Sequence, residues 1–359
     1  MAVDWSLLER DPLEYIMKKM VILSDHIRFS SVCSSWRTIA VNSRCRLPNQ
    51  FPGLMVTSED TSKRIFLQCI PPVSGSSGLQ YFSEHVIELP VSHKFSCRAS
   101  SYGWLVLTNG GYKMFLYHPF IRVKFDLPSM GTLPYPITPH EAKLSKWYVK
   151  KAVLSANPTT TVDKSTIIVL VIYGLLEPSL AFCKLGDIVW SPIRVQYGSY
   201  YLDAIYYKDH FYAINAWGGL CVCKIGDDDG RPRVNQLFRF GTPFLIHLPT
   251  MSTGIWLNRV LEPNAKKWVK VNSLDESTFF VGINSSFSIR SADFLGYSKN
   301  CIYFTDDYSI VEDLVKRPFV FGTDNGIYNV ADGSVEIIYP TDLWSTSLPI
   351  PMWVSRVPW

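Results

Sequence analysis

The feature that most constrains the fold is a unit of strand, turn and aromatic strand that recurs along most of the chain. Two copies begin at Asp203 (DAIYYKDHFYAINAWGGLCVCKIGD) and at Asp293 (DFLGYSKNCIYFTDD), each with a Lys-Asp or Lys-Asn turn between its strands. A related hairpin is predicted at residues 100–111. Such repeats are typical of solenoids, propellers and arrays, because each unit buries its apolar face against the next one.

The spacing of the repeat predicts a β-propeller. The second strand of each predicted unit is marked by one residue, and these markers are Phe66, Trp104, Ile168, Phe211, Trp256 and Ile302. Successive markers are 38, 64, 43, 45 and 46 residues apart. A four-stranded blade takes about 40–50 residues. Six blades are therefore the first prediction and seven the alternative, with the long interval explained by a loop inserted at 129–146.

The first 46 residues have the pattern of short helices instead. Asp11 is predicted as the N-cap of a helix that starts at Pro12, and Ser24-Asp25 as the cap of a second helix. Apolar residues then recur at steps of three to five through a third helix; they are Ile27, Val32, Cys33, Trp36, Ile39 and Ala40. The sequence thus predicts a mainly β protein, with a three-helix unit at 1–46 followed by a propeller at 47–359.

Composition and charge exclude several classes of partner. The formal net charge is +4 and the basic residues are spread along the chain, so no nucleic acid is expected as a partner. The longest apolar stretch, Ile167 to Leu176, is about half of the ~20 residues that cross a bilayer, so no membrane partner is expected either. The amino terminus lacks a secretory pattern, and we expect an intracellular protein, nuclear or cytoplasmic.

The sequence contains no motif that requires a cofactor, a metal or a catalytic site. The eight cysteines are scattered, and Cys221 and Cys223 have no second pair nearby to complete a zinc site. The acidic clusters Asp227-Asp228-Asp229 and Asp306-Asp307 are interpreted as turns, where Asp bonds its own backbone. A propeller hydrolase, which needs converging carboxylates, is kept as an alternative.

The helical segment resembles the F-box motif. The residues that carry the resemblance are Trp5-Ser6-Leu7-Leu8, Asp11, Leu13, Ile16, Leu23, Asp25 and Val32-Cys33-Ser34-Ser35-Trp36-Arg37. In that family the motif docks on the Skp-type adaptor of a cullin-RING ubiquitin ligase. The family usually has Leu-Pro where this chain has Leu8-Glu9, a turn that shapes its first contact with the adaptor.

The β segment resembles the carboxy-terminal domain of a large plant F-box family, often called KIB-like. The matching residues are Gly103-Trp104-Leu105, Pro119-Phe120, Trp268-Val269-Lys270-Val271, Phe279-Phe280-Val281-Gly282, Ile302-Tyr303-Phe304, Gly326-Ile327-Tyr328, Pro351 and Trp353. The family has Asn before Pro-Phe, where this chain has His118. Members of the family resemble substrate receptors of ubiquitin ligases.

Together the resemblances imply a non-catalytic adaptor. The helical unit is expected to bind a Skp-type adaptor, and through it a cullin, while the propeller presents a target protein for ubiquitination. The candidate residues for the adaptor-facing and supporting stripe are Leu8, Leu13, Ile16, Val32, Cys33 and Trp36. The alternative is a propeller that binds a protein or a carbohydrate, without a ubiquitin role.

Overall fold

The computed structural model describes most of the helical segment and the strands of the propeller. The described residues are 4–20, 23–42, 52–57, 60–68, 86–109, 112–134, 148–175, 177–194, 200–216, 219–225, 232–238, 259–262, 267–270, 272–282, 285–294, 297–305, 325–338 and 351–354. None of the helices in these ranges is long and apolar enough to cross a membrane.

Three α-helices form the amino-terminal unit, as the sequence predicted. A 3-10 turn, η1 (Trp5–Leu7), precedes α1 (Arg10–Lys19), α2 (Leu23–Ser30) and α3 (Ser34–Asn42). The predicted N-cap at Asp11 is wrong, because α1 begins at Arg10, two residues before the predicted start, and its N-cap is Glu9, whose side chain makes no capping bond. Pro12 still fits, since the first four N–H groups of a helix have no partner within the helix.

The described strands form five blades of four or five strands and one two-stranded sheet. Blade 1 contains β23 (Met352–Val354), β1 (Gly53–Thr57), β2 (Arg64–Gln68) and β3 (Val86–Leu89). Blade 2 contains β4 (Ser96–Ser101), β5 (Trp104–Thr108), β6 (Met114–His118) and β7 (Val123–Leu127). Blade 3 contains β8 (Val149–Leu154), β9 (Ile168–Tyr173), β10 (Ser179–Lys184) and β11 (Ser191–Pro192).

The remaining strands follow in the second half of the chain. Blade 4 contains β12 (Tyr201–Tyr207), β13 (His210–Asn215), β14 (Leu220–Lys224) and β15 (Arg233–Phe238). The two-stranded sheet contains β16 (Arg259–Glu262) and β17 (Lys267–Lys270). Blade 5 contains, in spatial order, β19 (Phe287–Arg290), β18 (Ser277–Val281), β20 (Cys301–Thr305), β21 (Asn325–Asn329) and β22 (Val335–Glu336).

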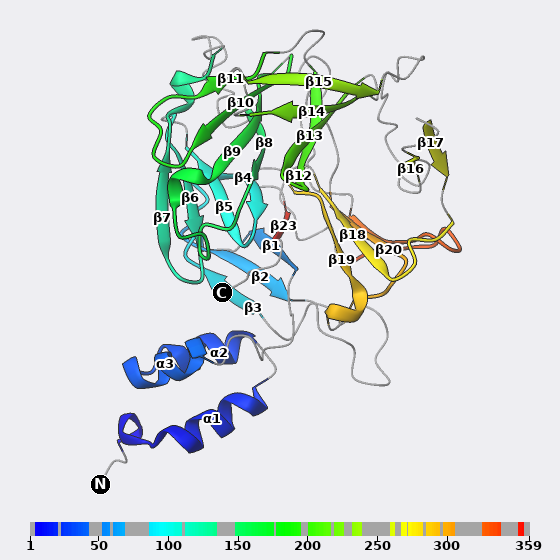
Figure 1. Cartoon of the computed structure of the whole chain (residues 1–359). Coiled ribbons are helices and arrows are strands. Elements are labelled where there is room, and N and C mark those ends of the chain that lie inside the picture. The colour runs from blue at the N-terminus through cyan, green and yellow to red at the C-terminus, as the bar shows by residue number, and fades with distance from the viewer. Residues whose placement is uncertain are drawn as a thin grey trace.

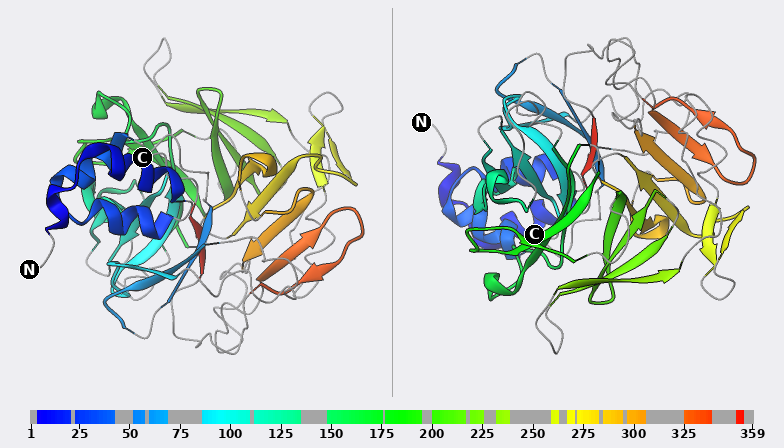
Figure 2. Two further views of the ribbon diagram at one scale, coloured as in Figure 1. Left: turned by 90° about the horizontal axis from the view of Figure 1, so that it is seen from below. Right: turned by 90° about the horizontal axis from the view of Figure 1, so that it is seen from above.

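The blades are arranged as a ring, and the two ends of the β segment close it. Figure 1 shows β23, β4, β8 and β12 toward the centre, with the helices beyond β3 at the rim. Both views of Figure 2 show β23, drawn in red, beside the blue strands of blade 1. There β23 pairs antiparallel with β1, from Gly53 opposite Val354 to Met55 opposite Met352. The last described strand is therefore part of the first blade.

The predicted number of blades differs from the structure. Five of the six markers fall in five separate blades, in β2, β5, β9, β13 and β20, whereas Trp256 lies outside the described residues. At the predicted start of the Asp293 unit, the described residues Asp293 and Phe294 belong to no named strand, and Asp293 ends a 3-10 turn. β18 pairs in parallel with β20 instead, from Thr278 opposite Cys301 to Val281 opposite Phe304. Spacing alone cannot reveal this pairing, because it joins strands that are not adjacent in sequence.

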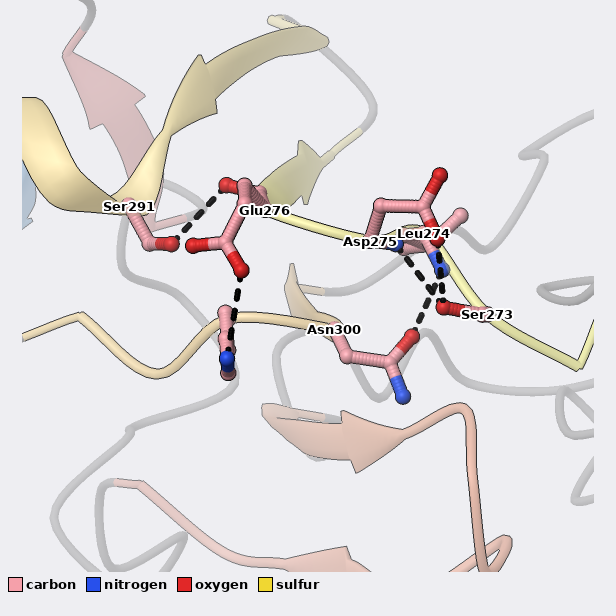
Figure 3. A network of polar contacts seen from close by, with 7 residues as sticks. Ser273, Leu274, Asp275, Glu276, Ser291 and Asn300 are labelled. Carbon is pink, nitrogen blue, oxygen red and sulfur yellow. Dashed lines mark hydrogen bonds and ion pairs between the residues drawn. The ribbon is translucent and has the colours of Figure 1, made fainter.

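A polar network fixes the parallel pairing (Figure 3). The side chain of Asn300, which directly precedes β20, accepts a hydrogen bond from the backbone N–H of Leu274 at 2.6 Å. Lys299 forms an ion pair with Glu276 at 3.1 Å. The Ser291 hydroxyl donates to the backbone carbonyl of Glu276 at 2.8 Å. These bonds hold the residues before β18 beside the residues before β20, so both strands start at the same level.

The predicted hairpin turn at Lys208-Asp209 is confirmed, and two further hairpins have tight turns of a related form. Lys208 and Asp209, between β12 and β13, have φ angles of 45° and 61°. Tyr102 and Gly103, between β4 and β5, have φ angles of 52° and 77°. Two consecutive residues with positive φ are the signature of the tight turn that matches the twist of a hairpin. Between β21 and β22, Gly333 has φ of 76° and the Asp332 carboxylate accepts from the backbone N–H of Ser334 at 2.8 Å.

His118, which stands where the resembled family has Asn, is fully buried at the end of β6. Its ring contacts that of Trp104 edge to face, with centroids 5.2 Å apart. Its Nδ1 accepts a hydrogen bond from the backbone N–H of Ile121 at 3.4 Å, which requires a neutral ring. Burial lowers the pKa of His118 from 6.5 to about 4.

We expect His118 to make stability depend on pH. The unfolded chain binds this proton near pH 6.5 and the folded chain near pH 4, so stability present above pH 6.5 is lost as the pH falls toward 4. A shift of this size corresponds to about 3 kcal/mol at most. Urea unfolding at pH 7.5 and pH 5.0 measures the loss, and His118→Asn should reduce it. The matched control is His210→Asn at the exposed first residue of β13. Equal pH dependence in the wild type and His118→Asn would contradict the assignment.

Candidate functional site

The helical unit has a small core of its own. Five side chains from all three helices are buried together, and they are Leu13, Met17, Phe29, Ile39 and Ala40. Leu8, Met20 and Trp36 pack against this cluster from its edge. The three helices therefore pack against one another, and this cluster contains no residue of the propeller.

The structure divides the six candidate residues between this core and the surface. Leu13 is 0% exposed and supports the helices from inside. Leu8 and Trp36 are half-buried against the same cluster. Ile16 on α1 is 37% exposed, and Val32, between α2 and α3, is 51% exposed. Cys33, next to Val32, is half-buried. The core thus brings Leu8, Leu13 and Trp36 together, and it does not include the other three.

Trp36 connects the start of the unit to its third helix. Its indole N–H donates to the backbone carbonyl of Trp5 at 3.1 Å. Its ring contacts that of Phe29 on α2, with centroids 4.4 Å apart. The backbone carbonyl of Cys33 accepts from the N–H of Arg37 at 2.9 Å, which begins α3. The Val-Cys-x-x-Trp-Arg run therefore has a structural role in ordering α3 against the first turn.

Four exposed apolar residues of the helical unit are absent from the candidate set. They are Trp5, Leu7, Tyr15 and Val41. Trp5 and Leu7 belong to the short 3-10 turn η1, where no helical period indicates which side faces solvent. Tyr15 directly precedes Ile16, and a lone exposed aromatic has no signature in the sequence. Together with Ile16 and Val32, these residues are the large apolar side chains that are exposed among the described residues of the helical unit.

Two ion pairs lie on the surface of the helical unit. Arg10 bonds Glu14 at 2.6 Å on α1, and Arg28 bonds Asp25 at 2.9 Å on α2. Solvent-exposed pairs of this kind contribute little to stability. Glu9, which replaces the usual proline, is exposed at the N-cap of α1. The Leu8-Glu9 departure therefore lies at the surface and leaves the helix start intact.

The centre of the propeller contains an ion pair between neighbouring inner strands. Lys151 of β8 pairs with Asp203 of β12. The acidic clusters at 227–229 and 306–307 lie outside the described residues. In the part of the chain that is described, no three His, Cys, Asp or Glu side chains gather as a metal site requires. Cys221 and Cys223 are both buried in β14, and burial raises the pKa of the Cys223 thiol to about 12.

Comparison with known proteins places the propeller segment in one family. The model of the KIB1-4 beta-propeller family matches residues 76–329, which is more than half of the chain.

Curated relatives match along nearly the whole length of the chain. A probable F-box protein of Arabidopsis thaliana is 20% identical over 84% of this chain and 84% of its own length. A second F-box protein of the same plant is 24% identical over 98% of this chain and 95% of its own length. F-box protein SKIP23 of Arabidopsis thaliana is 22% identical over 98% and 96%. The two matches over 98% of this chain extend over the helical unit as well as the blades.

Proposed function

This chain belongs to the KIB1-4 β-propeller family, and from that membership we propose that it is a substrate-recognition subunit of a Skp-cullin-F-box ubiquitin ligase. Residues 1–46 would dock on a Skp-type adaptor, and the propeller would bind the target protein. The proposal includes an intracellular location, nuclear or cytoplasmic. It assigns no catalytic step and no cofactor to this chain.

The observation that carries the proposal is the exposed apolar surface of the helical unit. Ile16 and Val32 are exposed although the unit has few apolar residues with which to stabilise itself. Contiguous exposed apolar side chains mark an interaction surface, and we infer that these residues belong to one. The relatives that match over 95% and 96% of their own length are named F-box proteins, which supports an adaptor as the occupant.

The mechanism is proximity. A receptor that binds its target and an adaptor at once raises the local concentration of target lysines near the charged ubiquitin-conjugating enzyme. Figure 1 shows the helical unit beyond β3, on the side of blade 1 that faces away from blade 4. The chain itself forms and breaks no bonds in this scheme.

A pull-down with a Skp-type adaptor tests the proposal. We expect the full chain to bind, and a chain lacking residues 1–46 to be folded and not to bind. If both are folded and neither binds, the ligase role is wrong and a binding propeller without a ubiquitin role is favoured. Restored binding in Glu9→Pro would then show that the Leu8-Glu9 departure weakens docking.

A point substitution separates docking from folding. Val32→Asp should lower adaptor affinity about tenfold or more, because a carboxylate buried in an apolar interface is strongly unfavourable. The helical signal in circular dichroism should stay unchanged, since Val32 is exposed in a connection between helices. Val162→Asp, at an exposed position of the propeller, is the matched control. Unchanged affinity in Val32→Asp would remove this residue from the docking surface.

A further inference from the structure

Two adjacent lysines of β8 have different surroundings at the centre of the propeller. Lys151 is 4% exposed, and its ammonium pairs with the carboxylate of Asp203 on β12. Lys150 is half-buried, and no carboxylate of the described residues pairs with it. Removing an ammonium from water without a partner is costly, so this arrangement disfavours the charged form of Lys150. The two side chains therefore differ in chemistry although they are neighbours in sequence.

The backbone places Lys150 outside the regular ladder of its strand. The pairing of β8 with β9 passes from Val149 to Lys151, so Lys150 is the extra residue of a β-bulge. A bulge leaves its extra residue unpaired and re-aims a side chain, and bulges are frequent next to functional sites. The surroundings of Lys150 are therefore not those that simple alternation along β8 would give it.

The ammonium of Lys150 lies beside an aromatic ring and not beside an anion. Its Nζ is 6.0 Å from the centroid of the ring of Tyr200, the residue directly before β12. The charged residue of β12 is Asp203, which is already paired with Lys151. Of the other strands packed against β8, β4 contributes the cation Arg98 and β9 contains no charged residue. The described strands around Lys150 thus offer it no unused carboxylate.

The amine of Lys150 is both accessible and partly neutral at physiological pH. Its Nζ has no hydrogen-bond partner among the described residues and is not one of the partnerless nitrogens that are cut off from solvent. Burial of the side chain lowers the pKa of Lys150 from 10.5 to about 8. At pH 7.5 about a quarter of such amines are neutral, compared with about one in a thousand at the ordinary pKa. Desolvated lysines of this kind are activated nucleophiles.

We propose that Lys150, in the bulge of β8 beside Tyr200, is a modification site that accepts an acyl group directly from a thioester. The neutral amine attacks the thioester carbonyl, so that a C–N bond forms and the C–S bond breaks. The leaving thiolate takes up the proton that the amine loses. The product is an uncharged amide, and acylation therefore removes the cation from this place in β8. The site belongs to the propeller, so the inference does not depend on adaptor docking.

Reaction of the full chain with acetyl-coenzyme A, followed by mass spectrometry that locates the acetyl groups, tests the proposal. At pH 7.5 we expect Lys150 to react at least about tenfold faster than Lys184, the exposed last residue of β10 in the same blade. This factor is smaller than the gain in neutral amine, because a less basic nucleophile is also a weaker one. The rate at Lys150 should level off above about pH 8. In concentrated urea the difference between the two lysines should disappear, since it depends on the folded surroundings.

A pair of substitutions at Tyr200 tests the geometry. Tyr200→Glu places a carboxylate near the ammonium, which favours the charged form and should slow acetylation of Lys150 at least about fivefold relative to Tyr200→Gln. Both variants remove the ring, so their difference reports the charge alone. If either variant does not fold, the comparison of Lys150 with Lys184 in the unchanged chain decides. An acetylation rate at Lys150 no higher than at Lys184, a difference that persists in urea, or equal rates in the two folded variants would overturn the proposal.

Discussion

Replacing Trp353 with alanine is expected to lower the free energy of unfolding by about 3–5 kcal/mol, the usual cost of removing a large buried aromatic side chain. Trp353 lies in β23 and is fully buried. Its ring contacts Phe280 of β18 and Tyr303 of β20, with centroid distances of 5.0 Å and 6.1 Å. One side chain thus packs blade 1 against blade 5. Urea unfolding of the full chain, followed by far-ultraviolet circular dichroism, measures the loss.

Trp353→Phe is the matched variant. The indole N–H has no hydrogen-bond partner, so phenylalanine loses no bond and keeps most of the ring contacts. We expect a clearly smaller loss than for alanine. Trp5→Ala, at an exposed position of the helical unit, controls for the removal of a tryptophan. Equal losses for Trp353→Phe and Trp353→Ala would contradict the explanation by ring packing.

Leu13→Ala is expected to destabilise the helical unit by about 2–5 kcal/mol, as other substitutions of a buried leucine do. Leu13 is 0% exposed and belongs to the cluster of five buried side chains formed by the described helical residues. A unit of about 46 residues has little other apolar burial with which to compensate. We therefore expect the helical signal at 222 nm to melt at lower temperature, while the blades unfold as before. Adaptor binding should fall together with the helical signal.

The neighbouring residue Tyr15 provides the control. Tyr15 is exposed on the same helix, so Tyr15→Ala should change stability by no more than about 0.5 kcal/mol. Leu13→Ala loses binding through folding, whereas Val32→Asp loses it with the helices intact. An unchanged melting temperature in Leu13→Ala would show that the helical unit does not depend on its own core.

The parts of the fold that depend on local chemistry could be predicted from the sequence. Lys208-Asp209 and Asp332-Gly333 form their turns because these residues tolerate positive φ and bond their own backbone. The three helices follow from apolar residues at helical spacing, and this signal extends over enough residues to be clear. The mainly β architecture could be predicted because units of strand, turn and strand recur along the chain.

Features that depend on distant residues could not be predicted. The parallel pairing of β18 with β20 is held by Asn300 and Lys299, whose partners are more than twenty residues away in sequence. The same limit applies to the candidate site, since nothing local distinguishes the buried Leu13 from the exposed Val32. No local pattern in the sequence predicts that the side chain of Arg64 in β2 is buried. This burial depends on the approach of two blades.

The pairing of β1 with β23 has a consequence for synthesis on the ribosome. Gly53 opposes Val354, so the edge of β1 that faces β23 stays unpaired until about 300 further residues have been made. At 5–20 residues per second this takes about 15–60 s. Open strand edges template aggregation. The helical unit, which needs only its own core, can fold during that time, and a chain that stalls early would present folded helices attached to an unclosed ring.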